Sequence, residues 1–431
     1  MTIILSAFCG LLLNAQPYDK SVHTDPEIIR GFMDKRFGMF IHWGPVSLRG
    51  TEIGWSRGRE VSKEDYDNLY KEFNPVLFDA NDWVKAAKDA GMKYLTITAR
   101  HHDGFSLWPS KFTEYDIAAT PYKKDIVGAL AKACKKADIE FCIYYSVLDW
   151  YHPDYPIHSA ADQTIDPKAD MDRYIMFMKN QLKELITRYD PYMLWFDGDW
   201  EKPWTNEMGR DIYAYLKELK PDLIVNNRLS NVGGGKRRTD DSMVGDYDTP
   251  EQKVGKLDMN VPWESCFTLS SQWAWKPNDN IKSLDQCLDI LSKTSGGNGN
   301  LLLNVGPMPD GRIEARQVTR LQEIGQWLKN NGDAVYNTFG GPYEPTDHYA
   351  STRKGNKIYL HVLNTDTATI ELKKIPGRKI QSAAVLGGKQ VNIIERDEHL
   401  LVQLPSSGQS GLNYIIELTL DGDAESIPVI R

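Results

Sequence analysis

An apolar run near the middle of the chain ends directly in acidic and aromatic residues. The segment YMLWFDGDW (192–200) leads into Asp197, which is followed by a glycine, a second carboxylate at Asp199 and Trp200. A continuous apolar run is typical of a strand buried on both faces, and catalytic groups often lie on the loops after such strands. The same residues also fit a plain D-G turn where a strand meets water. The other strand ends of the chain decide between these interpretations.

Polar and aromatic residues end the other predicted strands in the same way. They are His42-Trp43, Arg100-His101-His102-Asp103, Tyr144-Tyr145, Asp149-Trp150, Trp195 with Asp197, Arg228, Glu251, Glu264 and Asn304. In a (β/α)8 barrel the C-terminal ends of the strands form the active-site face. One such end would be a turn, whereas eight converging ends indicate a site.

Two carboxyl groups in an aromatic-lined pocket favour glycoside hydrolysis. In that reaction one carboxylate attacks or supports the anomeric carbon, while the other protonates the leaving oxygen. Asp197 is the candidate nucleophile, because it ends a rigid strand with Trp195 two residues back on the same side. The acid must keep its proton near neutral pH, and both Glu251 and Glu264 have suitable positions.

The histidine pair at 101–103 (HHD) has a competing interpretation as a metal site. Adjacent strand residues point to opposite sides, so His101 and His102 could face one ion only where the strand has already ended. The sequence contains no HExxH motif and no two histidines four residues apart. We therefore expect no metal and no other cofactor, and we expect histidines that bind sugar hydroxyls. A buried core histidine is the alternative, more so for His101 than for His102.

Strand and helix patterns alternate from residue 37 onward. The predicted strands are 37–44, 94–105, 141–150, 193–200, 223–229, 243–251, 262–267 and 300–307, and helical patterns cover 79–91, 125–137, 169–189, 206–221 and 283–294. Such alternation indicates a parallel sheet. Eight strands predict an α/β fold with a (β/α)8-like (TIM) barrel over residues 17–338, irregular between its fifth and seventh strands.

The two ends of the chain differ from this pattern. Short β-rich runs separated by turn residues predict a C-terminal antiparallel β-sandwich over 339–431. At the other end, the apolar residues 3–13 are too few to span a bilayer as a helix. They predict a signal peptide over residues 1–16, and therefore export to the periplasm or out of the cell.

Composition excludes several classes of protein. The chain of 431 residues is 41% hydrophobic and 26% charged, which is typical of a soluble globular protein. Its net charge of −8 offers no basic field to nucleic acid. The 12 Trp and 21 Tyr residues suit a sugar-binding cleft, because an aromatic ring covers the apolar face of a sugar.

Eight short motifs, in this order, resemble those of glycoside hydrolase family 29, the α-L-fucosidases. They are RFGMFIHWG, ARHHDGFSLWPS, YYSVLDW, LWFDGDW, VNNR, GDYDTPE, PWESC and LLLNVGPMPDG. The resemblance covers about residues 30 to 420. It implies a retaining exo-glycosidase without a cofactor, acting on a fucosylated oligosaccharide or glycoconjugate, with a (β/α)8-like barrel and a C-terminal β-sandwich.

The resemblance also implies roles for individual residues. It makes Asp197 the nucleophile and matches Glu251 to the acid/base, with Glu264 as the alternative or as a partner that positions other groups. The substrate-binding residues that it implies are His42, Trp55, His101, His102, Tyr144, Trp195, Arg228, Glu264 and Trp273.

The chain departs from the family pattern at two places. Gly54-Trp55 stands where many members have Glu-Trp, and SQWAWKP (271–277) replaces an aromatic-Gly-Tyr segment. Two alternatives therefore stay open beside the fucosidase: a glycosidase of related specificity, such as a galactosidase, and a catalytically inactive carbohydrate-binding protein.

Overall fold

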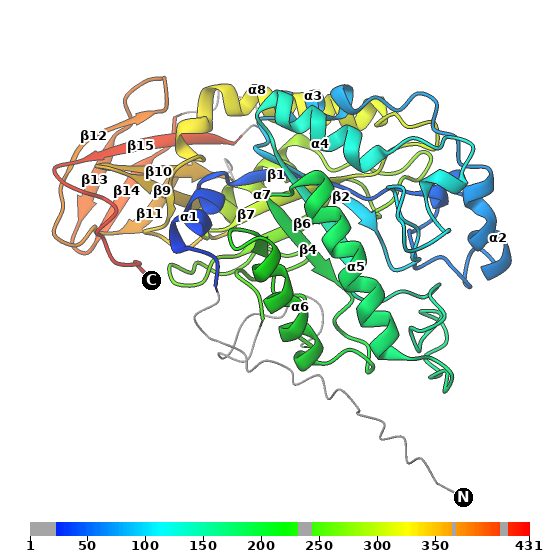
Figure 1. Ribbon diagram of the computed structural model, residues 1–431. Helices are drawn as coiled ribbons and strands as arrows, with labels where there is room; N and C mark the ends of the chain where they lie inside the picture. Colours follow the sequence, from blue (N-terminus) through cyan, green and yellow to red (C-terminus); the bar gives the residue numbers. More distant parts are fainter. Residues whose placement is uncertain (1–22, 232–243, 364–367, 406–412) are drawn as a thin grey trace, which may run out of the picture.

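The computed structural model describes residues 23–231, 244–363, 368–405 and 413–431. The predicted signal peptide, residues 1–16, lies outside the described residues. Figure 1 shows an α/β part coloured from blue through green to yellow, beside a smaller part built of strands in orange and red. The order of the two parts along the chain agrees with the prediction.

A seven-stranded parallel sheet forms the centre of the α/β part. Its order is β5-β4-β3-β2-β1-β7-β6, and each neighbouring pair of strands is parallel. The strands are β1 Phe37–Ile41, β2 Tyr94–Arg100, β3 Glu140–Ser146, β4 Met193–Asp197, β5 Ile224–Val225, β6 Glu264–Thr268 and β7 Asn300–Val305. The predicted parallel sheet is confirmed.

The strand predicted over 243–251 is wrong as a regular strand, and the strand predicted over 223–229 is reduced to the two residues of β5. The described residues 244–251 instead connect β5 to β6 through three single parallel bridges, Asn226 with Tyr247, Asp248 with Trp263, and Glu251 with Cys266. Gly245 has a φ of 115°, which lies outside the strand region. Pro250 has no N–H to donate to a ladder, so a continuous strand cannot form here.

Helices surround the parallel sheet (Figure 1). They are α1 Pro26–Asp34, α2 Lys63–Asn68, α3 Ala80–Asp89, α4 Ile126–Ala137, α5 Met171–Tyr189, α6 Asn206–Leu219, α7 Leu284–Gly296 and α8 Ala315–Asn331, with the short 3₁₀ helices η1 Pro45–Leu48, η2 Leu69–Lys71, η3 Ile117–Ala119 and η4 Gly332–Ala334. The five predicted helical patterns correspond to α3 through α7. Asp79 caps α3, because its side chain accepts a hydrogen bond from the Asn81 N–H. None of the helices in the described ranges combines the length and apolar character needed to cross a membrane.

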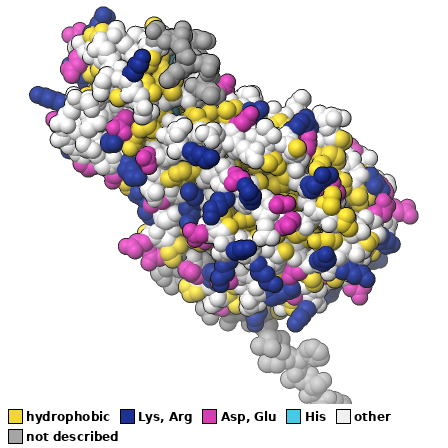
Figure 2. Space-filling view, turned by 90° about the horizontal axis from the view of Figure 1, so that it is seen from above, with side chains coloured by type: hydrophobic (Ala, Val, Ile, Leu, Met, Phe, Trp, Pro, Cys, Tyr) yellow, Lys and Arg dark blue, Asp and Glu magenta, His cyan; other side chains and the backbone are white. Residues whose placement is uncertain are grey.

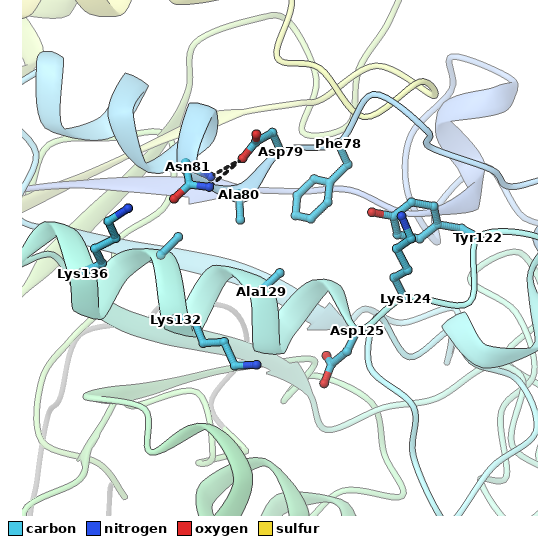
Figure 3. A pocket seen from close by; sticks show the side chains of 11 residues that line it. Phe78, Asp79, Ala80, Asn81, Tyr122, Lys124, Asp125, Ala129, Lys132 and Lys136 are labelled. Atoms are coloured by element: carbon cyan, nitrogen blue, oxygen red, sulfur yellow. Dashed lines mark hydrogen bonds between the residues drawn. The ribbon is translucent and has the colours of Figure 1, made fainter.

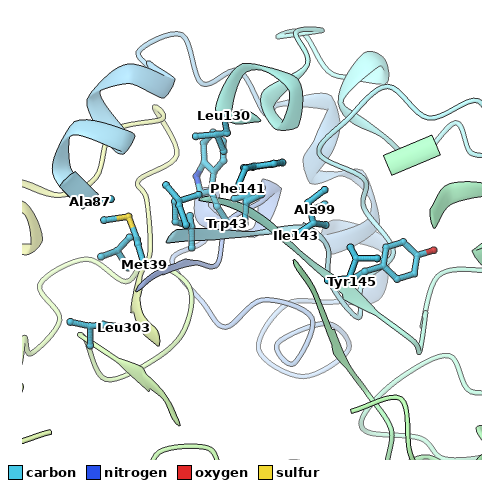
Figure 4. Packing of buried hydrophobic residues seen from close by; sticks show 14 of the residues in the cluster. Met39, Trp43, Ala87, Ala99, Leu130, Phe141, Ile143, Tyr145 and Leu303 are labelled. Carbon is cyan, nitrogen blue, oxygen red and sulfur yellow. The ribbon is translucent and has the colours of Figure 1, made fainter. Parts of the chain in front are cut away.

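The two faces of the parallel sheet have different apolar cores. On the outer face, Met39, Ile143 and Leu303 belong to the large cluster that includes Ala87 of α3 and Leu130 of α4 (Figure 4). On the inner face, Phe40, Tyr144, Trp195 and Leu302 form a separate, mostly aromatic cluster. Because side chains alternate along a strand, each strand contributes to both cores. The inner cluster lies directly beneath the ends of the strands where polar residues begin.

The C-terminal part consists of antiparallel strands, as predicted. They are β8 Phe339–Gly340, β9 Tyr349–Lys354, β10 Lys357–Val362, β11 Thr369–Lys373, β12 Ile380–Val385, β13 Ile393–Arg396, β14 His399–Gln403 and β15 Tyr414–Leu420. They form a five-stranded sheet, β12-β15-β10-β9-β8, and a three-stranded sheet, β11-β14-β13. One apolar cluster contains Leu360 and Leu418 from the first sheet and Leu372 and Val402 from the second. The two sheets therefore share a core.

Candidate functional site

A cavity of about 360 Å³ opens at the carboxyl ends of the parallel strands. Ten of the residues that the sequence analysis singled out line it, namely Asp197, Glu251, His42, Trp55, His101, His102, Tyr144, Trp195, Arg228 and Trp273. They come from the ends of five different strands and from the segments that follow them. Of the predicted catalytic and substrate-binding residues, Glu264 is the one that does not line the cavity.

Arg228 links the two candidate catalytic carboxyl groups. Its Nη1 donates a hydrogen bond to Asp197 Oδ1 at 2.8 Å, and it lies 3.0 Å from Glu251 Oε2. The two carboxyl oxygens can therefore be no farther apart than the sum of these distances, about 5.8 Å, which is shorter than the ~6.5–9.5 Å of inverting glycosidases. Arg228 is itself held by hydrogen bonds from Nε to the Thr249 hydroxyl and from Nη2 to the Thr249 carbonyl. Its guanidinium also lies over the Trp195 ring, 4.6 Å from the centroid.

Asp197 is held in its charged form. Burial by itself opposes that charge, but the Arg228 guanidinium and the hydrogen bonds from Arg228 and Tyr144 outweigh it and lower the pKa of Asp197. The Tyr144 hydroxyl donates to Asp197 Oδ2 at 3.0 Å. Asp197 ends β4, two residues after Trp195 on the inner face, so it lies at the base of the cavity as a carboxylate.

Glu251 lies nearer to solvent than Asp197. Its side chain is 37% exposed, against 13% for Asp197. It belongs to the irregular segment between β5 and β6, where its backbone bridges to Cys266. This placement leaves the Glu251 carboxyl at the rim of the cavity.

Glu264 does not line the cavity, so its predicted contact with substrate is not supported by its position. It is the first residue of β6 and is fully buried. Its carboxyl accepts hydrogen bonds from the Tyr94 hydroxyl at 2.5 Å and from Trp195 Nε1 at 3.0 Å. Burial raises the pKa of Glu264 to about 7, although these hydrogen bonds oppose the rise. Because side chains at the start of β6 point into the inner core, Glu264 lies behind Trp195 and supports its ring.

The three histidines of the cavity are neutral near pH 7. Burial lowers the pKa of His42 to about 3 and that of His102 to about 4. Burial, together with the neighbouring His102 and His42, also holds the pKa of His101 well below its ordinary value. Neutral imidazoles can both donate and accept hydrogen bonds, which suits the binding of hydroxyl groups.

Aromatic rings form two walls of the cavity. On one side Trp55 stacks with Trp200, their ring centroids 5.8 Å apart. In a second pair, Trp273 lies 4.8 Å from the His42 ring. Glu52 holds the Trp273 segment in place, because its carboxyl accepts the backbone N–H groups of Trp273 and Ala274 at 2.8 and 2.9 Å.

Gly54, the residue that departs from the family pattern, is constrained by the histidines beside it. It has a φ of 69°, and a Cβ at this position would lie 3.0 Å from His101 Nδ1 and 3.2 Å from His102 Cβ. A larger side chain would therefore need both a strained backbone and a shift of the histidines.

The sequence analysis did not assign three further residues of the cavity, Phe40, Trp200 and Cys266. For two of them the sequence contained a pattern that could have identified them. Phe40 lies two residues before His42, so strand alternation puts both side chains on the inner face, and Trp200 ends the quoted LWFDGDW motif. Asp199, the second carboxylate of that motif, is buried.

The HHD segment does not gather its side chains around one point. Asp103 is absent from the cavity lining, and its Oδ2 accepts a hydrogen bond from the Tyr66 hydroxyl at 2.7 Å. Among the described residues, no three His, Cys, Asp or Glu side chains are grouped as metal ligands would be.

Three other hollows among the described residues contain none of the predicted site residues. A hollow of about 340 Å³ lies between α3 and α4, where Phe78, Tyr122 and several lysines line it (Figure 3). Figure 2 shows Lys and Arg side chains interspersed with Asp and Glu over the face seen there. Of these hollows, the cavity at the strand ends is the one that gathers the predicted site residues.

A parallel α/β sheet with two carboxyl groups and aromatic walls at its strand ends defines a glycoside hydrolase. The family model for alpha-L-fucosidase matches residues 13–333. The chain belongs to this family, glycoside hydrolase family 29.

Individual relatives agree with this assignment. An alpha-L-fucosidase of Branchiostoma floridae is 31% identical over 333 residues, which cover 71% of each chain. The structure resembles alpha-L-fucosidase isoenzyme 1 from Paenibacillus thiaminolyticus, with a TM-score of 0.81, 34% identity and coverage of 92% of this chain and 99% of that one. It also resembles a family 29 alpha-L-fucosidase from Bacteroides thetaiotaomicron trapped as a covalent intermediate with 2-fluoro-fucosyl fluoride, with a TM-score of 0.83, 31% identity and coverage of 92% and 97%.

Proposed function

We propose that this protein is an exo-acting, retaining α-L-fucosidase that removes terminal fucose from oligosaccharides or glycoconjugates. The observation that carries the proposal is the pair Asp197 and Glu251, which share Arg228 Nη1 at 2.8 and 3.0 Å inside the aromatic cavity. Family membership supplies the substrate class. The cavity of about 360 Å³ lies at the small end of the ~300–1,000 Å³ range of ligand pockets, which suits a single terminal sugar.

In the first step, a carboxylate oxygen of Asp197 attacks the anomeric carbon of fucose. The bond from this carbon to the glycosidic oxygen breaks, and Glu251 transfers its proton to the departing oxygen. The product is a glycosyl ester on Asp197 and a free aglycone alcohol. The lowered pKa of Asp197 supports this role, because the nucleophile has to be ionised at working pH.

In the second step, Glu251 acts as a base. Its carboxylate takes a proton from water while the water oxygen attacks the anomeric carbon, and the ester bond to Asp197 breaks. Two displacements restore the original anomeric configuration. The exposure of Glu251 at the rim supports this role, since both the aglycone and the water approach from solvent.

The neutral histidines and the aromatic walls bind the sugar in this proposal. Imidazole nitrogens of His42, His101 and His102 pair with hydroxyl groups. Trp55 and Trp273 cover apolar faces of the sugar. Glu264 supports Trp195 from behind and does not touch the substrate.

A structural relative supports the double displacement. The Bacteroides thetaiotaomicron enzyme, 31% identical to this chain, was trapped as a covalent intermediate with a fluorinated fucosyl fluoride. A covalent sugar ester is the intermediate that a retaining mechanism requires.

A panel of nitrophenyl glycosides tests the proposal. We expect release of nitrophenol from the α-L-fucoside at a rate far above that from α- and β-galactosides. Faster turnover of a galactoside would favour the related glycosidase, and sugar binding without any turnover would favour an inactive carbohydrate-binding protein.

We extend the proposal to the architecture and the location of the protein. The bridged segment 244–251 completes an irregular (β/α)8-like barrel over residues 17–338, and the two C-terminal sheets form a β-sandwich over 339–431. The three bridges between β5 and β6, and the core that the two sheets share, support this view. Export to the periplasm or out of the cell rests on the apolar residues 3–13 alone.

A further inference from the structure

Two of the three cavity histidines bind the protein through Nδ1. His102 Nδ1 lies 2.7 Å from the Ser146 hydroxyl, and His42 Nδ1 lies 2.7 Å from Asn304 Oδ1. In the described part of the chain, no hydrogen-bond partner occupies the Nε2 atom of either ring. A neutral imidazole has one N–H donor and one acceptor nitrogen, so the partner of Nδ1 decides what Nε2 offers to a ligand.

Ser146 determines the proton position on His102. The Ser146 hydroxyl donates its single hydrogen to the Leu148 carbonyl at 2.6 Å. It can therefore only accept from His102, and Nδ1 of that ring must carry the proton. The Nε2 atom of the neutral ring is then an acceptor.

Asn304 determines the proton position on His42 in the same way. Its Nδ2 donates to the Trp273 carbonyl at 2.7 Å, which fixes the orientation of the amide. Oδ1 then faces His42, so His42 Nδ1 carries the proton and Nε2 is an acceptor.

The neighbourhood of Asp197 shows why the tautomer of His102 matters. His102 Nε2 lies 3.5 Å from Asp197 Oδ2, which is longer than an ordinary N–H···O hydrogen bond. With the proton on Nδ1, the two atoms are both acceptors, and a hydroxyl of a bound sugar can donate to Nε2. With the proton on Nε2, the ring would instead donate to the carboxylate and weaken it as a nucleophile.

His101 differs from its two neighbours. Its Nδ1 is buried and has no hydrogen-bond partner in the described part of the chain. Because a buried N–H without an acceptor is costly, the proton of His101 belongs on Nε2. The cavity then offers two acceptors, from His42 and His102, and one donor, from His101.

We propose that Ser146 and Asn304 are positioning residues of this site, which fix the Nδ1–H tautomers of His102 and His42 so that both rings accept hydrogen bonds from sugar hydroxyls. Only the identity of the ligand as a sugar rests on the proposed fucosidase function. The hydrogen-bond polarity is a property of the free protein.

Nitrogen-15 NMR of the imidazole groups in the free, full-length protein tests the inference directly. The signals are assigned with the variants His42→Gln, His101→Gln and His102→Gln, each of which removes one ring. At neutral pH we expect a protonated Nδ1 for His42 and His102 and a protonated Nε2 for His101. A protonated Nε2 on His102 or His42, or averaging between the two tautomers, would overturn the proposal.

Ser146→Ala tests whether the tautomer matters for turnover. We expect the His102 proton to move to Nε2 in the NMR spectrum and kcat on a nitrophenyl fucoside to fall about tenfold, the size of one hydrogen bond. Ser146→Thr keeps the hydroxyl and should recover most of the rate. Ser351→Ala, which removes a buried hydroxyl bonded to the Tyr343 backbone in the C-terminal part, is the matched control for stability.

The possible results separate this inference from the proposed function. A moved proton with unchanged kcat and KM would refute the positioning role, while the fucosidase assignment would stand. Absence of fucosidase activity in the wild-type protein would refute the proposed function, and the NMR measurement would still decide the tautomers.

Discussion

Arg228 holds Asp197 and Glu251 on a single nitrogen, with Nη1 2.8 Å from Asp197 Oδ1 and 3.0 Å from Glu251 Oε2. The two carboxyl groups differ in every other respect. Asp197 is at the base of the cavity and accepts a further hydrogen bond from Tyr144, whereas Glu251 is at the rim, with its side chain 37% exposed. This asymmetry fits the proposed roles, with the ionised, fixed Asp197 as nucleophile and the accessible Glu251 as acid/base.

Replacement of Asp197 by Asn or Gly should abolish turnover while sugar binding persists. The loss of a covalent nucleophile costs several kcal/mol in the barrier, on the order of a thousandfold or more in kcat. Azide should partly restore turnover in Asp197→Gly, because it occupies the space of the missing carboxylate. The control is Asp211→Asn, a surface carboxylate paired with Lys179. Retention of a tenth of wild-type activity by either Asp197 variant would exclude this residue as nucleophile.

Glu251→Ala should slow the enzyme according to the leaving group. A general acid matters most when the leaving group is poor, so natural fucosides should lose far more rate than a dinitrophenyl fucoside. Glu264→Ala should slow both substrates alike, because Glu264 is buried behind Trp195 and acts through that ring. The kcat/KM values of each variant for the two substrates decide which glutamate is the general acid. The reverse pattern would make Glu264 the acid.

Hydrolysis should proceed with retention of configuration. The oxygens of Asp197 and Glu251 that share Arg228 are no more than about 5.8 Å apart, which leaves less room than the ~6.5–9.5 Å that an inverting enzyme needs for its water. Proton NMR at early times should therefore show α-fucose as the first sugar formed. Initial formation of the β anomer would contradict the double displacement.

Arg228→Met should move the acid limb of the pH profile to higher pH. Arg228 is among the groups that lower the pKa of Asp197 against the effect of burial, so its loss raises that pKa. Asp197 would then be protonated at a pH where the wild-type group is still ionised. We also expect kcat/KM at neutral pH to fall on the order of a hundredfold, since a buried carboxylate loses its charged partner. An acid limb that does not move would contradict this role. Arg173→Met, which breaks the surface pair with Asp154, is the control.

Glu264→Gln should change the pH dependence of stability. Burial raises the folded-state pKa of Glu264 to about 7. A raised pKa contributes stability below the unfolded value of ~4.3, and this contribution is lost as the pH rises through 7. The free energy of unfolding of the variant, relative to that of the wild type, should therefore be higher at pH 8.5 than at pH 5 by up to the order of 3 kcal/mol. Melting temperatures of both proteins at the two pH values measure this change. An equal stability difference between variant and wild type at both pH values would contradict the shifted pKa of Glu264. The control is Glu218→Gln, a substitution of an exposed glutamate.

The sequence by itself determined which strand ends would carry the site. Asp197 follows Trp195 by two residues, and His42 follows Phe40 by two, so the alternation of side chains along a strand places each pair on one face. Parallel strands bring their carboxyl ends to one edge of the sheet. Local pattern and this topological rule together were enough to predict eight of the residues that line the cavity, whereas Trp55 and Trp273 were predicted only through the resemblance to the family.

Only the tertiary structure separated Glu251 from Glu264. The two residues are thirteen positions apart and both lie close to the end of a predicted strand, so local pattern treats them alike. Which of the two glutamates is buried and which lines the cavity depends on where β6 begins. Glu264 is the first residue of that strand and points into the inner core against Tyr94 and Trp195, whereas Glu251 lies on the irregular segment before it.

The same limit applies to the hydrogen-bond partners of the histidines. His42 meets Asn304 across 262 positions of the chain, and His102 meets Ser146 across 44. Such contacts are fixed by the packing of strands far apart in the sequence, and periodicity carries no information about them. The residue types of the site can therefore be predicted from the sequence. Their burial, charge and proton positions depend on which distant side chains the fold places beside them.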